Sequence, residues 1–137
     1  MKILTLRKHE KPINSIKINY DGDLVFSASS DTYVHLWRTS NGERLGSFKC
    51  NAAIKSIDIT RDSKYLIAGN LIGDLEIFEI YGGKKAADVS IVKGRVKNLE
   101  LSLSNDKLLI VNSQNSDFRF SMEFSMKVWY LLSISTK

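Results

Sequence analysis

Four side chains near the start of the chain have the types needed for a hydrogen-bonded relay. His9, Ser27 and Asp31 are the residue types of a hydrolytic triad, in which an acid orients a histidine that activates a serine. Trp37 follows Asp31 by six positions and adds an indole N–H, which needs an acceptor when it is buried. The set could therefore either catalyse acyl transfer or hold a fold together through a polar network.

The surroundings of Ser27 favour the structural role. Its neighbours are Phe26 and Ala28, so the Gly-x-Ser-x-Gly turn that exposes a nucleophile is missing. We expect a structural tetrad, no catalytic residue and no enzymatic activity. The tetrad consists of His9, Ser27, Asp31 and Trp37.

Three other features raise the question of a ligand site. Gly82-Gly83-Lys84-Lys85 lacks the spacing of a phosphate-binding loop and is expected to be a turn with solvated lysines. His35 has no second histidine or acid at metal-ligand spacing along the chain and is expected to be a partly exposed strand residue. Cys50 is the single cysteine and is expected to be a buried filler. No cofactor and no metal site is predicted.

Composition limits the class of protein further. The 137 residues carry a formal net charge of +5, but the lysines are dispersed, so direct RNA binding is not expected. No apolar run reaches the length of a membrane span, and the start of the chain has no signal-peptide core. One cysteine permits no internal disulfide. These features indicate a cytoplasmic protein without a membrane partner.

A repeat positions the four polar residues. Short alternating apolar runs separated by glycine-containing turns predict an all-β chain. The run Ile13–Ile18 returns as Ile54–Ile59, and Trp37 returns as Phe78, each 41 residues later. A third copy begins at Val96, 42 residues after the second, and aligning Leu109 with Leu66 suggests one further residue in its turn. This period predicts propeller blades of four strands each.

The second repeat lacks the tetrad. Its equivalent positions hold Cys50, Ala68, Ile72 and Phe78. We therefore expect apolar packing to replace the polar network throughout that repeat, which also argues against an active site.

The tetrad spacing and the hexapeptide Asn41–Gly46 resemble the family of the WD-repeat subunit i of eukaryotic translation initiation factor 3. The resemblance implies an incomplete WD-repeat β-propeller of about three four-stranded blades. Residues 1–137 would form one partial propeller. Its repeats would cover about 9–49, about 50–90 and, in degenerate form, about 91–137.

The family resemblance also implies a function. It suggests a non-catalytic scaffold subunit that joins subunits b and g and supports assembly of the initiation complex, contacting the small ribosomal subunit indirectly. Two alternatives remain open: another WD-repeat adaptor, or a basic propeller that binds RNA.

Two structural expectations follow from the repeat. Asn41-Gly42 should form the tight turn between the third and fourth strands. About 3.3 blades cannot close a ring of four to eight. Ile3–Leu6 should then be a strand without a partner, and the apolar residues between Phe120 and Ile134 should stay uncovered. An open stack of sheets that self-associates is expected.

Overall fold

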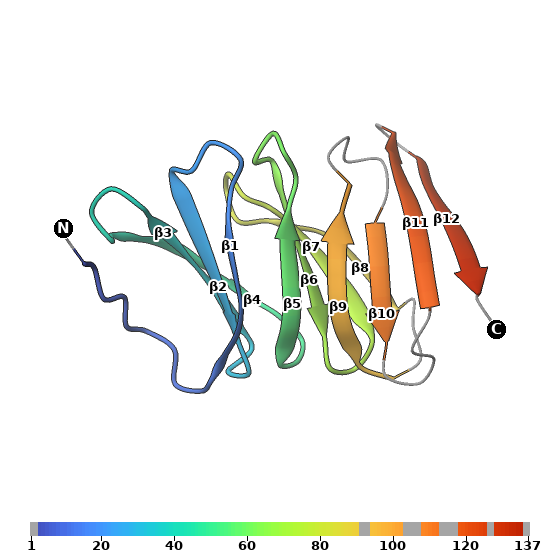
Figure 1. The fold of residues 1–137 in the computed structure, drawn as a ribbon, viewed down its shortest axis with the longest axis horizontal. Helices are drawn as coiled ribbons and strands as arrows, with labels where there is room; N and C mark the ends of the chain where they lie inside the picture. The colour runs from blue at the N-terminus through green and yellow to red at the C-terminus, as the bar shows by residue number, and fades with distance from the viewer. Residues whose placement is uncertain (1–2, 91–93, 103–107, 113–117, 126–127, 136–137) are drawn as a thin grey trace.

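The computed structural model describes residues 3–90, 94–102, 108–112, 118–125 and 128–135. Every regular element in these ranges is a β-strand. Within them, no helix is long and apolar enough to cross a membrane. The strands form successive antiparallel layers that fan out along the molecule, with the amino terminus at one end and the carboxyl terminus at the other (Figure 1).

The first sheet, blade one, is a meander of four strands in chain order. It contains β1 (Ile13–Ile18), β2 (Leu24–Ser29), β3 (Tyr33–Arg38) and β4 (Arg44–Lys49). Asn41-Gly42 lies in the β3–β4 turn, and Gly42 has φ +73°. Glycine adopts this left-handed conformation without the steric penalty of a Cβ atom, so the predicted tight turn is confirmed.

The second sheet, blade two, repeats the first without a gap. It contains β5 (Ile54–Ile59), β6 (Tyr65–Asn70), β7 (Asp74–Glu79) and β8 (Lys85–Ser90), each bounded 41 residues after its counterpart. The register shift in the pairing of the first two strands also recurs, after Ile13 in blade one and after Ile54 in blade two. The predicted all-β propeller fold is confirmed.

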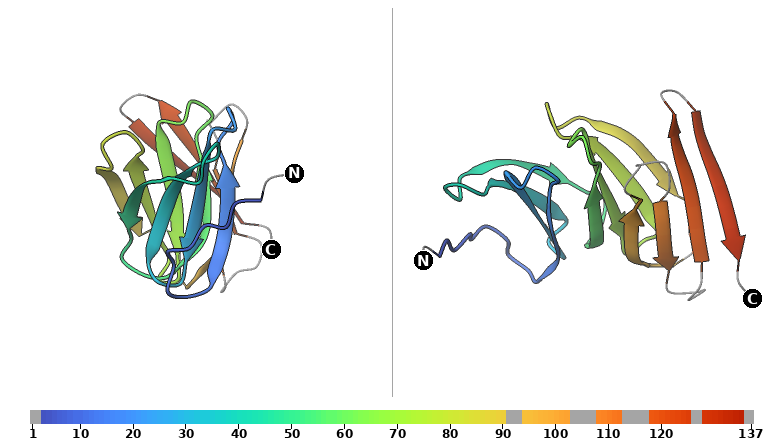
Figure 2. Two further views of the ribbon diagram at one scale, coloured as in Figure 1. Left: turned by 90° about the vertical axis from the view of Figure 1, so that its left-hand side faces the viewer. Right: turned by 45° about the horizontal axis from the view of Figure 1, so that its top comes forward.

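The last four strands form two separate two-stranded sheets, whereas a four-stranded third blade was expected. β9 (Val96–Leu101) pairs with β10 (Leu108–Asn112), and β11 (Phe118–Ser125) pairs with β12 (Val128–Ser135). Figure 2 shows β11 and β12 beyond β10, farther from blade two. The side chains between Phe120 and Ile134, which were expected to be uncovered, lie outside the described part.

The register of β9 and β10 corrects the alignment of the third repeat. Leu101 pairs with Leu108 as Ile59 pairs with Leu66, so both strands are offset by 42 residues from blade two. The expected extra residue in the β9–β10 turn is therefore wrong. A run of similar leucines and isoleucines concealed the register, and the single additional residue precedes β9.

Blades one and two are joined by apolar side chains from facing sheets. Phe26, Val34 and Phe48 contribute from blade one, and Ile54 and Ile57 from blade two, all of them buried. Burial of each such side chain contributes about 1.5 to 3 kcal/mol relative to exposure. Burial of these side chains at the interface between the two blades therefore stabilises this half of the chain.

The opposite face of blade two packs against β9 and β10. Because side chains alternate along β6, Leu66 faces blade one whereas Ile67 faces the third layer. Gly69 lies at this second contact, where a Cβ atom would overlap the side chains of Val96 and Leu99. The equivalent position in blade one holds Ala28, so a glycine is required only at the second interface.

The outer face of blade one has no covering sheet in the described residues. Ile13, Ile16 and Ile18 are 47%, 60% and 62% exposed, whereas their counterparts Ile54, Ile57 and Ile59 are at most 9% exposed. Residues 3–12 form no strand, whereas Ile3–Leu6 was expected to be a strand without a partner. Leu6 instead lines an apolar groove on this face with Ile16, Val25 and Trp37.

Substitution of Gly69 tests the close approach of the second and third layers. We expect Gly69→Val to lower the free energy of unfolding by about 1 to 3 kcal/mol, because the added methyl groups overpack the contact with Val96 and Leu99. Urea unfolding monitored by circular dichroism would measure the change. Gly46→Ala is the control, since an added Cβ there meets nothing within 4 Å. Equal stability of the two variants would contradict the proposed contact.

Candidate functional site

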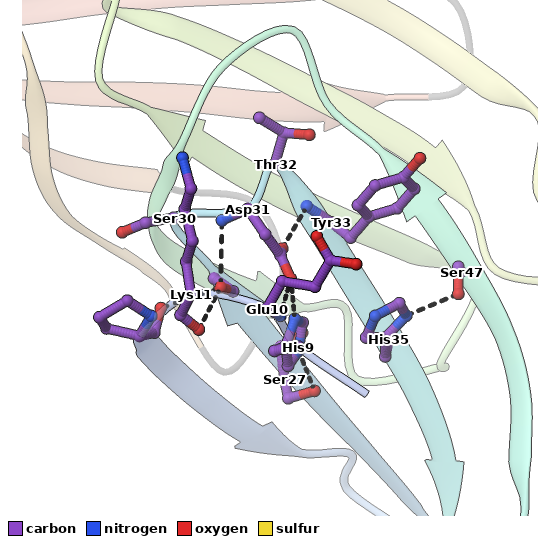
Figure 3. Close-up of polar contacts among 12 residues, drawn as sticks. His9, Glu10, Lys11, Ser27, Ser30, Asp31, Thr32, Tyr33, His35 and Ser47 are labelled. Atoms are coloured by element: carbon purple, nitrogen blue, oxygen red, sulfur yellow. Dashed lines mark hydrogen bonds and ion pairs between the residues drawn. The ribbon is translucent and has the colours of Figure 1, made fainter. Parts of the chain in front are cut away.

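The structure brings the four predicted residues into one hydrogen-bonded chain. Trp37 Nε1–H donates to Ser27 Oγ at 2.9 Å, and Ser27 Oγ lies 2.7 Å from His9 Nε2. His9 Nδ1 lies 2.9 Å from Asp31 Oδ2. Because a carboxylate only accepts, Nδ1 carries a proton and donates to Asp31, while Nε2 lies against both the hydroxyl of Ser27 and, at 3.1 Å, its carbonyl oxygen. Figure 3 shows His9 between Ser27 and Asp31.

Asp31 links this network to the backbone. Its Oδ2 accepts from the Glu10 N–H at 3.1 Å, and its Oδ1 accepts from the Tyr33 N–H at 3.0 Å. Burial alone would raise the pKa of Asp31, but hydrogen bonds from Tyr33, His9 and Glu10 outweigh it and hold the pKa below its ordinary value. One carboxylate therefore joins the segment before β1 to the turn before β3.

The connectivity matches a hydrolytic triad, but the environment of the serine does not. Ser27 is buried within β2, and its oxygen already accepts a hydrogen bond from the Trp37 indole. A nucleophile must present a free lone pair to a substrate carbonyl beside an oxyanion-binding site. The arrangement is better suited to holding β2, β3 and the segment before β1 in register.

His35 differs from the sequence expectation. It was expected to be partly exposed, but it is only 4% exposed. Its Nδ1 is hydrogen-bonded to Ser47 Oγ at 2.6 Å, and the centroid of its ring lies 4.3 Å from that of His9. It also has an acid and a second histidine near it in space, since potential ligand atoms of His9, Asp31 and His35 all lie within 4.8 Å of one another. The sequence separation of 26 residues between the histidines concealed this proximity.

Blade two contains a different polar network, which corrects the expectation of apolar packing throughout. Glu76 is fully buried, and its carboxylate accepts from the Asn51 N–H at 3.0 Å and from Asn70 Nδ2 at 2.9 Å. Asn51 is the counterpart of Glu10, and Glu76 is the counterpart of His35. The same backbone donor is thus satisfied by a loop carboxylate in blade one and by a strand carboxylate in blade two.

Lys85 completes the second network. Its Nζ lies 2.6 Å from Glu76 and 3.6 Å from Asp88. Burial lowers the pKa of Lys85, but its hydrogen bond to Glu76 and the nearby carboxylates outweigh burial and raise it overall. Burial and the Glu76 carboxylate also raise the pKa of the Cys50 thiol, which is therefore protonated and suited to the filler role expected for it.

A sequence signal for Glu76 was present. It interrupts the apolar strand Leu75–Phe78, where a charged side chain is exposed or paired, and Lys85 follows nine positions later in the adjacent strand. Glu76 is the counterpart of His35, which lies outside the tetrad, so the tetrad positions alone do not reveal it.

The two repeated four-stranded meanders, each with a hydrogen-bonded network at its entrance, define a β-propeller protein. The sequence model of the family described as TEP-1 C-terminal beta-propeller matches residues 9–79. The chain therefore belongs to a β-propeller family. Among solved structures, the chain resembles U3-55K with a TM-score of 0.85 at 17% identity, covering 96% of this chain and 41% of that one. It also resembles the RRP9 WD40 repeats with a TM-score of 0.84 at 17% identity and the same coverage of 96% and 41%.

Curated relatives give a closer likeness. The chain is 36% identical over 114 residues to eukaryotic translation initiation factor 3 subunit I of Dictyostelium discoideum, which covers 83% of the chain and 34% of the relative. It is also 36% identical over 112 residues to the subunit I of Kluyveromyces lactis, covering 81% and 32% respectively. The predicted resemblance to subunit I is confirmed, and the chain spans about a third of the length of these relatives.

Two substitutions test the tetrad as a structural element. Trp37→Phe removes the indole N–H but keeps an aromatic ring, and His9→Ala leaves Ser27 and Asp31 without their shared partner. We expect each to lower the free energy of unfolding by about 1 to 3 kcal/mol. Thermal melts would measure this effect. Unchanged melts, combined with loss of a defined hydrolytic activity in His9→Ala, would contradict the structural role.

Acidification should destabilise the fold through His35. Burial, followed by the nearby charge of His9, lowers the pKa of His35 from 6.5 to about 4. Between these two values the unfolded chain binds a proton that the folded chain does not, so stability is lost as the pH falls from 6.5 towards 4. The loss amounts to at most roughly 3 kcal/mol.

Urea midpoints at pH 7 and pH 4.5 would measure this loss, with His35→Gln as the comparison. Asp31 titrates below its ordinary value of 3.8, so it contributes little at pH 4.5. The wild type should lose more stability than the variant over this interval. Equal losses would show that His35 is not the responsible group.

Proposed function

We propose that this chain is a non-catalytic scaffold segment of a cytoplasmic translation initiation factor 3 subunit, and that it supports assembly of the initiation complex on the small ribosomal subunit. The observation that carries the proposal is its similarity, over more than four fifths of its length, to relatives named subunit I. The family expectation of subunits b and g as binding partners is part of the proposal. In this proposal, contact with the small ribosomal subunit is indirect.

The geometry supports a role in binding rather than catalysis. The polar residues in blades one and two that resemble a reaction centre bond to each other and to the backbone. The prominent feature left for an interaction is the outer face of blade one, with Ile13, Ile16 and Ile18 exposed. Large apolar groups gathered on one face of a sheet favour burial against another surface.

The internal repeat indicates what covers this face. The counterparts Ile54, Ile57 and Ile59 pack against the face of a neighbouring blade, which presents Phe26 and Val34. We therefore assign the outer face of blade one to a further blade of the same repeat within a complete propeller. Ile3–Leu6 would contribute an outer strand to that blade.

The proposal predicts the behaviour of one substitution on the outer face. In cells, a tagged complete subunit that contains this segment should copurify with subunits b and g, and Ile16→Asp should reduce recovery about tenfold or more, because the covering blade would bury an unpaired charge. Quantitative mass spectrometry of the purified complexes would measure recovery. Tyr81→Asp is the matched control, since Tyr81 is 76% exposed in the β7–β8 turn.

The controls separate two ways in which the proposal could fail. If the wild-type protein recovers no initiation factor subunits but does recover other proteins, the adaptor alternative replaces the initiation role. If Ile16→Asp and Tyr81→Asp behave alike, the outer face of blade one takes no part in assembly. Salt-sensitive recovery of RNA without these subunits would favour the RNA-binding alternative.

A further inference from the structure

Two imidazoles and a carboxylate meet on blade one, beside the tetrad. The side chains of His9 and Asp31 are 4% and 9% exposed, and His35 is 4% exposed. One potential ligand atom from each residue lies within 4.8 Å of the other two. Asp31 and His35 also line a pocket that opens to solvent, together with Lys8, Glu10, Arg44 and Ser47. The cluster is thus buried on one side and accessible on the other.

His35 has a ring nitrogen suited to coordination. Ser47 Oγ lies 2.6 Å from Nδ1 and fixes the orientation of the ring. No hydrogen bond joins Nε2 to any of the residues that the structure describes, and Figure 3 shows this edge of the ring turned away from Ser47 towards His9 and Asp31. A hydrogen bond to one nitrogen that orients the other is the usual arrangement around a metal-bound histidine.

We propose that His9, Asp31 and His35 form a binding site for a divalent transition-metal ion of the Zn²⁺ class. Two imidazole nitrogens and one carboxylate oxygen are ligands that Zn²⁺ accepts, with a fourth position left for water or an anion. That position faces the pocket, where Lys8 and Arg44 favour an anionic ligand. Blade two supplies no comparable set at these positions, which hold Cys50, Ile72 and Glu76.

The tetrad and the metal site use different atoms for most of their contacts. The ion would take the place of the proton between His9 Nδ1 and Asp31, replacing their 2.9 Å hydrogen bond and releasing that proton to solvent, while Nε2–H of the ring donates to Ser27. The N–H groups of Glu10 and Tyr33 continue to hold the Asp31 carboxylate. Ligand atoms of a tetrahedral zinc site lie roughly 3.3 Å apart. Metal binding would therefore separate His9 Nδ1 and Asp31 slightly from their present 2.9 Å and bring His35, whose ligand atom lies within 4.8 Å of theirs, closer to both.

The site is tested with Co²⁺ and Zn²⁺ on the whole 137-residue chain, in the oligomeric state in which it purifies. The chain should bind one Co²⁺, with the visible absorption of a four-coordinate ion, and Zn²⁺ should displace it. Zn²⁺ should also raise the melting temperature. His35→Gln should weaken Co²⁺ binding about tenfold or more and abolish the visible band, since it removes a ligand while leaving the tetrad untouched.

Glu10→Gln is the matched control, because Glu10 lines the same pocket but is not among the three ligands. It should bind Co²⁺ within about twofold of the wild type. Comparable melting of His35→Gln and the wild type at pH 7 without metal would exclude misfolding as the cause of lost binding. Absence of the Co²⁺ band in the wild-type chain, or an undiminished band in His35→Gln, would overturn the site.

Discussion

Face-to-face packing of neighbouring sheets is the constraint on which the rest of the structure depends. Blade one and blade two each bury an apolar face that neither could leave in water at low cost, and Phe26 and Phe48 meet Ile54 and Ile57 across the interface. A single four-stranded sheet has two faces, so blade two is buried on both whereas blade one is covered on one. The polar networks add to this packing, because their hydrogen bonds hold the segment that precedes the first strand of each sheet.

Apolar packing joins the sheets, and polar contacts hold the segments that enter them. Because these two roles are separate, the two repeats can differ widely in sequence. Strand boundaries coincide at an offset of 41 residues because the apolar alternation and the left-handed turn positions are kept. Gly22, Thr32 and Gly42 recur as Ser63, Gly73 and Gly83, and all six have a positive φ. The groups that satisfy the backbone at the entrance of each sheet are not kept. What both blades need is an acceptor for one N–H, that of Glu10 or Asn51, and a carboxylate supplies it in each.

Much of the fold was predictable from the sequence, and part of the site was not. Alternation and the Asn41-Gly42 turn are local signals, so the strands of blades one and two and the β3–β4 turn followed from the order of the residues. The third repeat was misaligned by one residue because Leu108, Leu109 and Ile110 offer similar registers, and only pairing with β9 decides among them. His35 and Glu76 were misjudged for a related reason. Their burial depends on side chains such as Ser47 and Lys85, which come from the adjacent strand.

The exchange of Asp31 for Glu76 has an evolutionary consequence. A repeat carrying an acid at both positions would have two acceptors within reach of a single backbone donor, and either acid could then be lost with little harm. Erosion of a repeat signature can therefore proceed while the blade stays folded, and signature scores alone will undercount the blades of divergent propellers.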